Sequence, residues 1–411
     1  MTKLLLLVIP VFIYAQSLKS LLDFATTNNK MAISKDLKEM AREKEVESSK
    51  SEYFPTIDAG AFYSRDDDRT KNIPGDTYSG YAKISLDIYN GGETQNTIKQ
   101  NKELSLSAKY NSLSYKKSLQ LSITEDYYNI KSDEATLNAL KDKELQLLAE
   151  LDRVKKFFDV GSATIDEIDR LKAEYSDNLY QIDQVKYQII SLKKLLSIKI
   201  GKRVDSIDEA FIEEPKDITK DISDTILALK SSASALKYGA NVISSAYMPQ
   251  VKIEDTYSLY GYERYDKSHP KGIDDQNKLM LTLNMRLFDM GTISKQKEAL
   301  ILEANALQSE VEYAINEQDV NVELAMLKIG TTKAQIKSAK SSLESAESAY
   351  NTISEKYEVG SVDNVTYLDA LSVRTNAKSQ YERALNNLQI SYASYYYHTN
   401  KNIKEYIKWE K

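Results

Sequence analysis

Hydrophobic and polar residues alternate along four segments of the chain, which pair into two predicted β-hairpins, at residues 55–89 and 249–289. The clearest strand is the return strand of the second hairpin, where every second residue is apolar: Leu279, Leu281, Leu283, Met285 and Leu287. A period of two places these side chains on one face of a strand. Each strand has about ten residues, the length that a tilted strand needs to cross a membrane. The same alternation would also fit one sheet of a soluble sandwich.

Long segments without proline follow both hairpins and predict two long helices, at residues 92–159 and 292–358. The first segment has no glycine after Gly92, and Gly330 is the only glycine in the second. At 1.5 Å per residue each helix would measure roughly 100 Å. Helices of this length need a coiled-coil partner rather than a globular core, so we expect long helical hairpins.

The second long helix carries apolar or small residues at alternating intervals of three and four, which defines a packing seam. The seam runs through Val322, Ala325, Ile329, Thr332, Ile336, Ala339, Leu343, Ala346, Tyr350, Ile353 and Tyr357. Leu300, Ala304, Leu307 and Val311 keep the same rhythm upstream. The connecting path, through positions 311, 315, 319 and 322, has consecutive steps of four, which is a stutter. It places Asp319 on the seam and predicts that the packing partner changes near residues 315–322.

The two halves of the chain share an order of elements and of short motifs. The markers of the first half are Tyr53-Phe54-Pro55, Asn90-Gly91-Gly92 and Val160-Gly161-Ser162. Those of the second half are Tyr247-Met248-Pro249, Asp289-Met290-Gly291 and Val359-Gly360-Ser361. Shorter helices are expected before each hairpin, the second at 222–246, and after each turn, at 164–200 and 363–400. The chain is therefore predicted to be two structural repeats, 16–210 and 211–411, that form a single obligate assembly.

The N-terminus has the layout of a secretory signal peptide. Lys3 precedes an apolar run from Leu4 to Ile13, and Ala15 ends a small-residue cleavage site, so residues 1–15 are the predicted signal. About ten apolar residues are too few for a helix that spans a bilayer. We therefore expect an exported protein.

Composition argues against an enzyme. The chain has no cysteine and only two histidines, His269 and His398, so no thiolate or metal cluster and no nucleophilic constellation can be assembled. Neither a cofactor nor a metal is expected. The net charge of −6 is mild and the lysines are dispersed, which gives no footprint for nucleic acid. The 29 tyrosines, against 8 phenylalanines, suit boundaries between apolar and wet surroundings.

Four membrane-type strands cannot close on themselves, and lipid does not tolerate an open sheet edge. If the strands enter a membrane, several copies must therefore share one barrel, and the helix pairs would continue it as a tube with a polar lumen. The alternative is a secreted coiled-coil stalk or adhesin with soluble hairpins and no pore.

The signal peptide, the two Tyr-x-Pro strand starts, the glycine turns and the two Val-Gly-Ser turns together resemble the TolC family of outer-membrane efflux proteins. Residues 359–370 are similar to the second helix-turn-helix tip of that family. The resemblance implies an α+β membrane protein: a homotrimer with a 12-stranded outer-membrane β-barrel, four strands per chain, continued by a periplasmic α-helical barrel. It places the protein in the outer membrane of a Gram-negative bacterium, in contact with outer-membrane lipid.

The resemblance also implies a function and partners. The channel would be the exit duct of a tripartite efflux pump or a type I secretion system. Its partners would be a periplasmic adaptor (membrane fusion) protein and an inner-membrane transporter of RND or ABC type. The turns Val160-Gly161-Ser162 and Val359-Gly360-Ser361 would dock the adaptor.

Members of the family close the periplasmic end with the second helical hairpin. By position, Asp369 matches the second of two aspartates that form the entrance ring in the family. Thr366 stands where the first aspartate would be, and Asp363 lies nearer the turn. Tyr357 matches a gating tyrosine of the family, and Glu167 stands where the acidic partner of that tyrosine would be. A ring of three carboxylates at a narrow mouth would favour cations. The other reading of Asp369 is an acidic residue on a solvated helix face.

The gating arginine of the family falls on Val362, so this chain lacks that link. The two halves thus share the same order of strands, helices and turns, but they differ in the residues at the predicted mouth.

Overall fold

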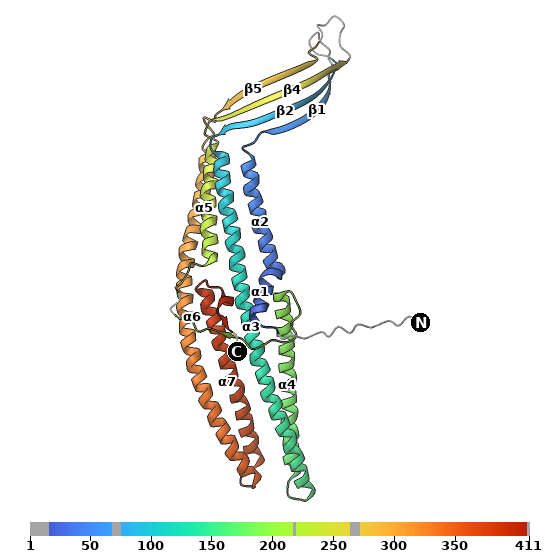
Figure 1. Cartoon of the computed structure of the whole chain (residues 1–411), viewed down its shortest axis with the longest axis vertical. Coiled ribbons are helices and arrows are strands. Elements are labelled where there is room, and N and C mark those ends of the chain that lie inside the picture. Colours follow the sequence, from blue (N-terminus) through green and yellow to red (C-terminus); the bar gives the residue numbers. More distant parts are fainter. Residues whose placement is uncertain (1–15, 68–74, 217–218, 264–271, 409–411) are drawn as a thin grey trace, which may run out of the picture. The chain divides into compact units, whose positions relative to one another are not determined.

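The computed structural model of the 411-residue chain describes residues 16–67, 75–216, 219–263 and 272–408 (Figure 1). The predicted signal peptide, residues 1–15, and His269 lie outside the described residues. The chain forms two compact units. The sheet unit comprises Asp36–Asn111 and Thr225–Ala314, and the equatorial-and-turn unit comprises the segment up to Lys35, Ser112–Asp224 and the segment from Ile315. Each unit takes corresponding parts from both halves of the sequence.

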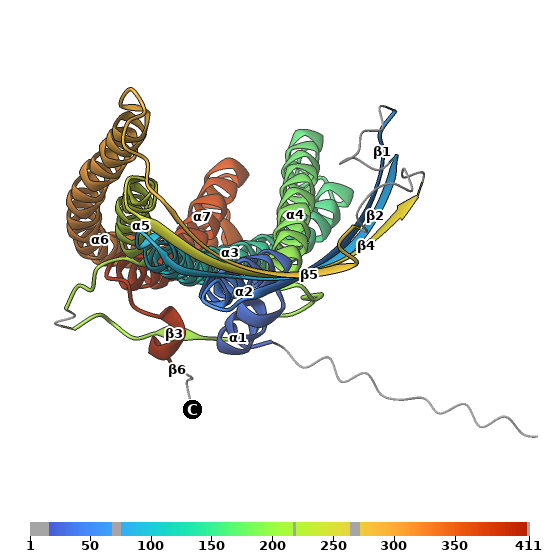
Figure 2. The same ribbon diagram turned by 90° about the horizontal axis from the view of Figure 1, so that it is seen from above.

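The sheet unit holds one antiparallel sheet made from both hairpins. Its strands are β1 (Thr56–Arg65), β2 (Asp76–Asn90), β4 (Gln250–Glu263) and β5 (Asp275–Asn284), in the order β1-β2-β4-β5. Figure 2 shows them as one curved layer. Strands β2 and β4 pair across the sequence repeat, so the two hairpins are joined side by side and β1 and β5 are the edges.

The register of the sheet places the alternating apolar residues on one face. Residues directly opposite in an antiparallel pair share a face, and Leu86, Ile253 and Leu281 form one such row across three strands. Asp255 lies on the same face, between Ile84 and Leu279. The predicted alternation therefore holds, although Asp255 lies among the apolar residues of this face.

The return strand of the second hairpin is shorter than predicted. Strand β5 ends at Asn284, opposite Gln250, which is the first residue of β4. Pro249 precedes Gln250 and has no N–H to offer a continued ladder. Met285 and Leu287 therefore lie beyond the strand, although their spacing continues the alternation.

Two helices of 67 residues run through both units: α3 (Glu93–Asp159) and α6 (Thr292–Glu358). The sheet unit also contains two shorter helices. They are α5 (Asp224–Ser245), all but its first residue, and α2 (Lys30–Ser51), from Asp36 onward. Within the described part of the chain, no helix has both the length and the apolar character that crossing a membrane requires.

The equatorial-and-turn unit contains a layer of four helices, formed by the later parts of α3 and α6 with α4 (Ile165–Ile200) and α7 (Asn364–His398). Hydrogen bonds and ion pairs between the helices give their lateral order. Asn178 of α4 donates to the Leu140 carbonyl of α3 at 3.0 Å, and Lys378 of α7 binds Asp142 of α3 at 2.8 Å. Thr332 of α6 and Ser391 of α7 are 3.2 Å apart. The order is therefore α4–α3–α7–α6, as Figure 1 also shows for the end that carries the two turns.

The core of this unit surrounds helix α1 (Leu18–Asn28) and the middle of α3. Its fully buried side chains include Leu21, Ile123, Tyr127, Leu196 and Tyr396. A short two-stranded sheet, β3 (Phe211–Ile212) with β6 (Ile407–Lys408), and the 3-10 helix Ile403–Tyr406 lie beside it. This core holds the upper ends of the helical hairpins.

Residues 207–216 and 219–223, which we call the connector, contact three helices in the order α3, α7 and α6. The hydroxyl groups of Tyr127 and Tyr128 on α3 donate to the carbonyls of Asp208 and Ala210. On α7, Gln389 accepts from the Ile212 N–H at 2.6 Å, and Tyr396 donates to the Glu213 carbonyl at 2.9 Å. The connector is thus fixed mainly through its own backbone at α3 and α7.

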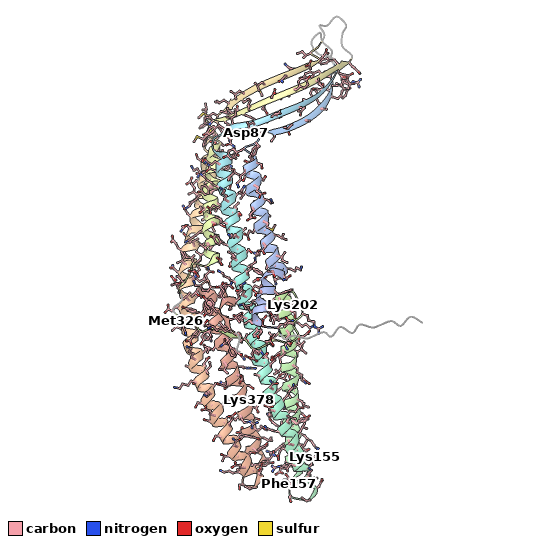
Figure 3. All side chains as sticks on the ribbon, in the orientation of Figure 1. Asp87, Lys155, Phe157, Lys202, Met326 and Lys378 are labelled. Carbon is pink, nitrogen blue, oxygen red and sulfur yellow. The ribbon has the colours of Figure 1, made fainter. Side chains whose placement is uncertain are left out.

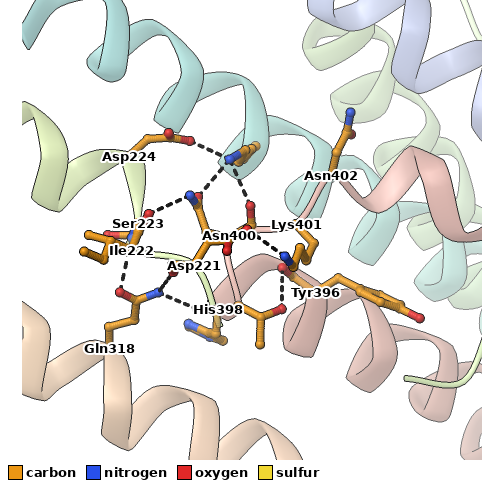
Figure 4. A network of polar contacts seen from close by, with 12 residues as sticks. Asp221, Ile222, Ser223, Asp224, Gln318, Tyr396, His398, Asn400, Lys401 and Asn402 are labelled. Atoms are coloured by element: carbon orange, nitrogen blue, oxygen red, sulfur yellow. Dashed lines mark hydrogen bonds and ion pairs between the residues drawn. The ribbon is translucent and has the colours of Figure 1, made fainter. Parts of the chain in front are cut away.

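At α6 the connector is held by side chains. Lys333 pairs with Glu214 and Lys220 pairs with Asp319. Figure 4 shows the third link: the buried Gln318 donates to the carbonyls of Asp221 and His398, each at 2.9 Å, and accepts from the Ser223 N–H at 3.2 Å.

The seam of α6 corrects two predictions. The buried positions of the helix recur every seven residues without a break: Ala304, Val311, Gln318, Ala325, Thr332, Ala339 and Ala346. The predicted stutter is therefore wrong. The placement of Asp319 on the seam is also wrong, because Gln318 is buried and Asp319 is exposed in an ion pair with Lys220. The expected change of packing partner is confirmed, since α6 up to Ala314 belongs to the unit of α5 and from Ile315 to that of α7.

Candidate functional site

The two Val-Gly-Ser turns have the same backbone structure. Gly161 and Gly360 have φ values of +76° and +73°, a region that glycine enters without a steric penalty. At the second turn the Ser361 N–H donates to the Lys356 carbonyl at 2.8 Å and the Gly360 N–H to that of Tyr357 at 3.1 Å. The first turn repeats both bonds one sequence repeat earlier. This pattern is the Schellman motif, so both long helices end in one defined geometry.

Exposed apolar side chains surround these turns. Val160 and Val359 occupy the position before the glycine in each turn and are among the most exposed apolar residues of the chain. Phe157 and Phe158 are also exposed at the end of α3 (Figure 3 labels Phe157). Exposed apolar clusters of this kind are typical of contact surfaces. The predicted docking turns Val160-Gly161-Ser162 and Val359-Gly360-Ser361 are therefore accessible in the single chain.

Asp363 and Thr366 bind one another at the start of α7. The Asp363 carboxylate accepts from the Thr366 N–H at 2.9 Å and from its hydroxyl at 2.6 Å. Such bonds satisfy an N–H at a helix N-terminus. They also hold the pKa of Asp363 below its ordinary value, with a smaller contribution from the charge of Arg170. Thr164, at the same position of α4, makes no side-chain cap.

Tyr357 lies in a cluster that joins three helices. Its hydroxyl accepts from the Asn364 side-chain amide at 2.8 Å, and its ring stacks on Tyr367 with centroids 4.8 Å apart. The guanidinium of Arg153, on α3, lies 4.5 Å from the centroid of the Tyr357 ring. Burial is the main reason that the pKa of Tyr357 is raised. The ring therefore links α6 to α3 and to the first turn of α7.

Glu150 orients Arg153 for this contact. The Arg153 guanidinium donates to both carboxylate oxygens of Glu150, at 3.0 Å from Nε and 2.9 Å from Nη2. The Glu150 side chain is buried, so the bidentate pair fixes the guanidinium against the tyrosine ring. We call Glu150, Arg153 and Tyr357 the lower clasp.

A second group of the same kind lies about two helical turns above. The Gln146 side-chain oxygen, on α3, accepts from the Tyr350 hydroxyl at 3.2 Å and from Arg374 at 2.9 Å. The Arg374 guanidinium also lies 3.9 Å from the centroid of the Tyr350 ring. Gln146, Tyr350 and Arg374 form the upper clasp, which joins α3, α6 and α7.

The predicted gate residues do not all meet in one chain. Asp363, Thr366 and Tyr357 lie around the second turn, whereas Asp369 is exposed on α7 and Glu167 is half-buried on α4. Among the described residues, the polar contacts of Tyr357 include Asn364 and Arg153 but not Glu167. In this single chain the acidic residue beside Tyr357 is therefore Glu150.

Sequence reasoning missed both clasps. Glu150 and Arg153 are three residues apart, a spacing that is common for exposed pairs on helix surfaces. The spacing of Tyr350 and Tyr357, seven residues apart on the seam, was the available signal, since two hydroxyl-bearing rings at seam positions need partners. The described residues contain no group of three or more side chains that could hold a metal ion.

Comparison with solved structures defines the class of protein. The fold is similar to that of the Campylobacter jejuni CmeC outer membrane channel, with a TM-score of 0.82 at 17% identity over 93% of this chain and 85% of that one. The Vibrio cholerae outer membrane protein VceC gives 0.78 at 13% identity, covering 94% and 96%. The open state of the Neisseria gonorrhoeae MtrE outer membrane channel gives 0.75 at 13%, covering 93% and 89%. The chain therefore has the fold of outer-membrane channels.

The sequence identifies the family. The model of the outer membrane efflux protein family matches residues 25–195 and 222–397, which is most of the chain and includes both repeats. The chain therefore belongs to the outer membrane efflux protein family. A comparison with curated proteins gives no match.

Membership confirms several predictions at once. The resemblance to the TolC family is confirmed, as is the fold class of long helices with a four-stranded sheet. The protein is an efflux channel of the Gram-negative outer membrane that extends into the periplasm, and it is not an enzyme. The alternative of a stalk or adhesin without a pore is set aside, because the family match covers both helical hairpins.

Proposed function

We propose that three copies of this chain form the exit duct of a tripartite export assembly, an efflux pump or a type I secretion system. Substrates would pass from an inner-membrane transporter of RND or ABC type, through a periplasmic adaptor, to the exterior. The observation that carries the proposal is the family match to both repeats, together with two identical turns that each chain presents.

The open edges of the sheet support an assembly of several copies. Strands β1 and β5 each have one side without a strand of their own chain among the described residues. Unpaired backbone groups are not tolerated in lipid. Three sheets joined from β5 of one copy to β1 of the next would give twelve strands and satisfy both edges in contact with outer-membrane lipid.

The gate of this duct is proposed at the second helical turn. The lower clasp holds α6 against α3 through Arg153 and Tyr357. Separation of the two helical hairpins would break this contact and widen the mouth. Asp369, exposed on α7, would form the acidic ring with its copies, while Thr366 and Asp363 set the start of the helix that carries it. Glu167 would face a neighbouring copy rather than its own Tyr357.

The adaptor would bind the two turns. Both present an exposed valine next to a glycine in one fixed backbone geometry, so one adaptor surface could recognise both. Val160, Gly161 and Ser162 would form one docking element, and Val359, Gly360 and Ser361 the other.

Conductance in planar bilayers tests the proposal. Purified protein should give discrete channels that trivalent cations block from the periplasmic side, and Asp369→Ala should relieve the block. Asp177→Ala, an exposed acid on α4 away from the turns, is the matched control and should leave the block unchanged. Folded protein without conductance would contradict the duct, and an unchanged block in Asp369→Ala would contradict the acidic ring.

A further inference from the structure

A polar groove lies between α4 and α7 in the equatorial-and-turn unit, with α3 as its floor. It consists of two cavities of about 500 Å³ and about 330 Å³, which share Gln188 and Arg383 as lining residues. Along α4 the groove extends from Gln181 to Ser191, a rise of about 15 Å. Sites for small molecules have volumes of about 300–1,000 Å³. The groove is therefore large enough for a ligand.

Uncharged amide side chains dominate the two walls. They are Gln181, Gln184 and Gln188 on α4, and Asn376, Gln380 and Asn387 on α7. Gln188, Gln380 and Asn387 are exposed, and within the described chain their side chains have no hydrogen-bond partner. Each carboxamide offers two donors and an acceptor oxygen. The walls thus present unused donors and acceptors on both sides of the groove.

One ion pair contributes the charged groups among the lining residues. The Arg383 guanidinium, on α7, lies 3.7 Å from the Asp133 carboxylate, on α3, and their side chains are 51% and 16% exposed. This distance is too long for a hydrogen bond, so both planar groups can still bind a ligand. Their charges cancel, and the other residues that line the two cavities are uncharged. The groove therefore favours a ligand without net charge.

The groove opens on the side of α7 that carries Asp369. Asp369, Asn376 and Arg383 follow one another at intervals of seven residues, which places them on nearly the same side of a helix. If Asp369 lines the mouth of the duct, the groove lines the same lumen about 20 Å further along α7. Arg374 is nine residues from Arg383, or two and a half turns. It lines a separate cavity of about 570 Å³ on the other side of α7, together with Asn351.

We propose that this groove binds uncharged oligosaccharides on the wall of the duct. A sugar hydroxyl group both donates and accepts. It can therefore bind an amide on either wall, or lie between Arg383 and Asp133 by accepting from the guanidinium and donating to the carboxylate. Tyr187 lines the same groove and adds an aromatic ring with a polar tip, against which the apolar face of a sugar ring can pack.

Other classes of ligand match the lining less well. An apolar solute would cover the amides without replacing their hydrogen bonds to water, and the apolar lining residues Leu140 and Val185 are already buried in helix packing. A polypeptide carries charged and apolar side chains that this lining does not complement. The inference rests on the proposed duct for the position of the groove, and it adds neutral glycans as a class of exported substrate.

Calorimetric titration of the full-length protein in detergent with maltohexaose, a neutral linear sugar, tests the site. We expect saturable binding that Gln188→Leu with Asn387→Leu weakens at least tenfold, because both walls lose hydrogen-bonding groups. Each single substitution is measured as well, so that a misfolded double variant leaves the test intact. The control is Asn351→Leu, which removes an exposed amide from the cavity on the other side of α7 and should leave the affinity unchanged.

Bilayer recordings then test the position of the groove. Maltohexaose should interrupt the current through open channels, and the double variant should shorten the interruptions at least tenfold. Sugar binding without interruptions, or retention of the protein on cell-wall sacculi too large to enter a lumen, would overturn the placement inside the duct. Sugar binding by a protein that forms no channels would support the groove and contradict the duct alone.

Three outcomes of the titration would overturn the sugar site itself. The first is no binding of maltohexaose by the folded protein. The second is an equal loss of affinity in Asn351→Leu and in the groove variants. The third is equal affinity for a neutral glycine-serine hexapeptide, which would show that the amides bind a peptide backbone as well as they bind a sugar.

Discussion

The lower clasp makes a quantitative prediction about the gate. In Arg153→Met the methylene stem keeps its packing, but the guanidinium that lies 4.5 Å from the Tyr357 ring centroid is lost. Glu150 lies on the same helix as Arg153, so the ring contact is the part of the clasp that joins α3 to α6. Because Glu150 is buried and would be left without its cation, the variant to test is Glu150→Gln with Arg153→Met, which removes both charges.

The magnitude follows from the exposure of the pair. A cation–π contact contributes about 0.5–1 kcal/mol when exposed and about 2 when desolvated, and the Arg153 side chain is 30% exposed. About 1 kcal/mol per chain is therefore expected, or about 3 kcal/mol for three chains that open together. That corresponds to a shift of about 100-fold toward the open state. Chains that open independently would each shift about fivefold.

Channel recordings measure this shift as the fraction of time spent in the open state. The control is Lys156→Met, which removes an exposed ion pair with Asp152 one turn away on the same helix. Exposed pairs contribute little, so the control should behave like the unaltered channel. An open fraction in the Glu150–Arg153 variant that equals the control would refute the clasp as a lock. A rise that Tyr357→Leu does not reproduce would show that the ring is not its partner.

Three further predictions concern the connector, the turns and the helix cap. Gln318→Leu should cost about 1–2 kcal/mol in thermal unfolding, because the hydrogen bonds of the buried Gln318 side chain to half-buried backbone groups are lost, whereas Asp319→Ala should cost under about 1 kcal/mol. Gly360→Ala should cost about 1–2 kcal/mol at its positive φ, whereas Gly330→Ala, in open space within α6, should not destabilise. The pKa of Asp363 is lowered, so its stabilisation is present above its ordinary pKa of 3.8 and is lost as pH falls through the folded value. Proteolysis at the turn should therefore increase on acidification, and Asp363→Asn should flatten that dependence; equal pH profiles would contradict it.

The sequence predicted the fold well where periodicity is long. The α6 seam extends over many turns, so its rhythm was visible although most of its members are small. The error in the position of the seam came where two adjacent residues are both polar. The choice between Gln318 and Asp319 depends on the backbone around Gln318, which binds Asp221 and Ser223 of the connector and the His398 carbonyl at the end of α7. The end of β5 likewise depends on where its partner strand begins.

The site was less accessible from sequence. Position in the repeat pointed to Tyr357 and to the turns, because those features are local. The partners of Tyr357 come from α3 and from the start of α7, and only the lateral order of the helices brings Arg153 to it. The sequence also did not show that the Asp363 carboxylate caps α7 through Thr366. Its proposed place at the mouth stays a prediction.

The connector sets a limit on how the channel can move. The described parts of the connector are bound to α3 and α7 mainly through their backbone, and to α6 through Gln318. The three helices therefore cannot move apart at this level without breaking several buried or partly buried hydrogen bonds. We therefore expect the parts of the helices between the connector and the two turns to tilt about the level of the connector. The roughly 40 residues from Gln318 to Glu358 span about 60 Å, so a tilt of about 5° would move the turn by about 5 Å. In the proposed duct, the mouth would therefore open by several ångströms while the helices of each chain keep their spacing at the level of the connector.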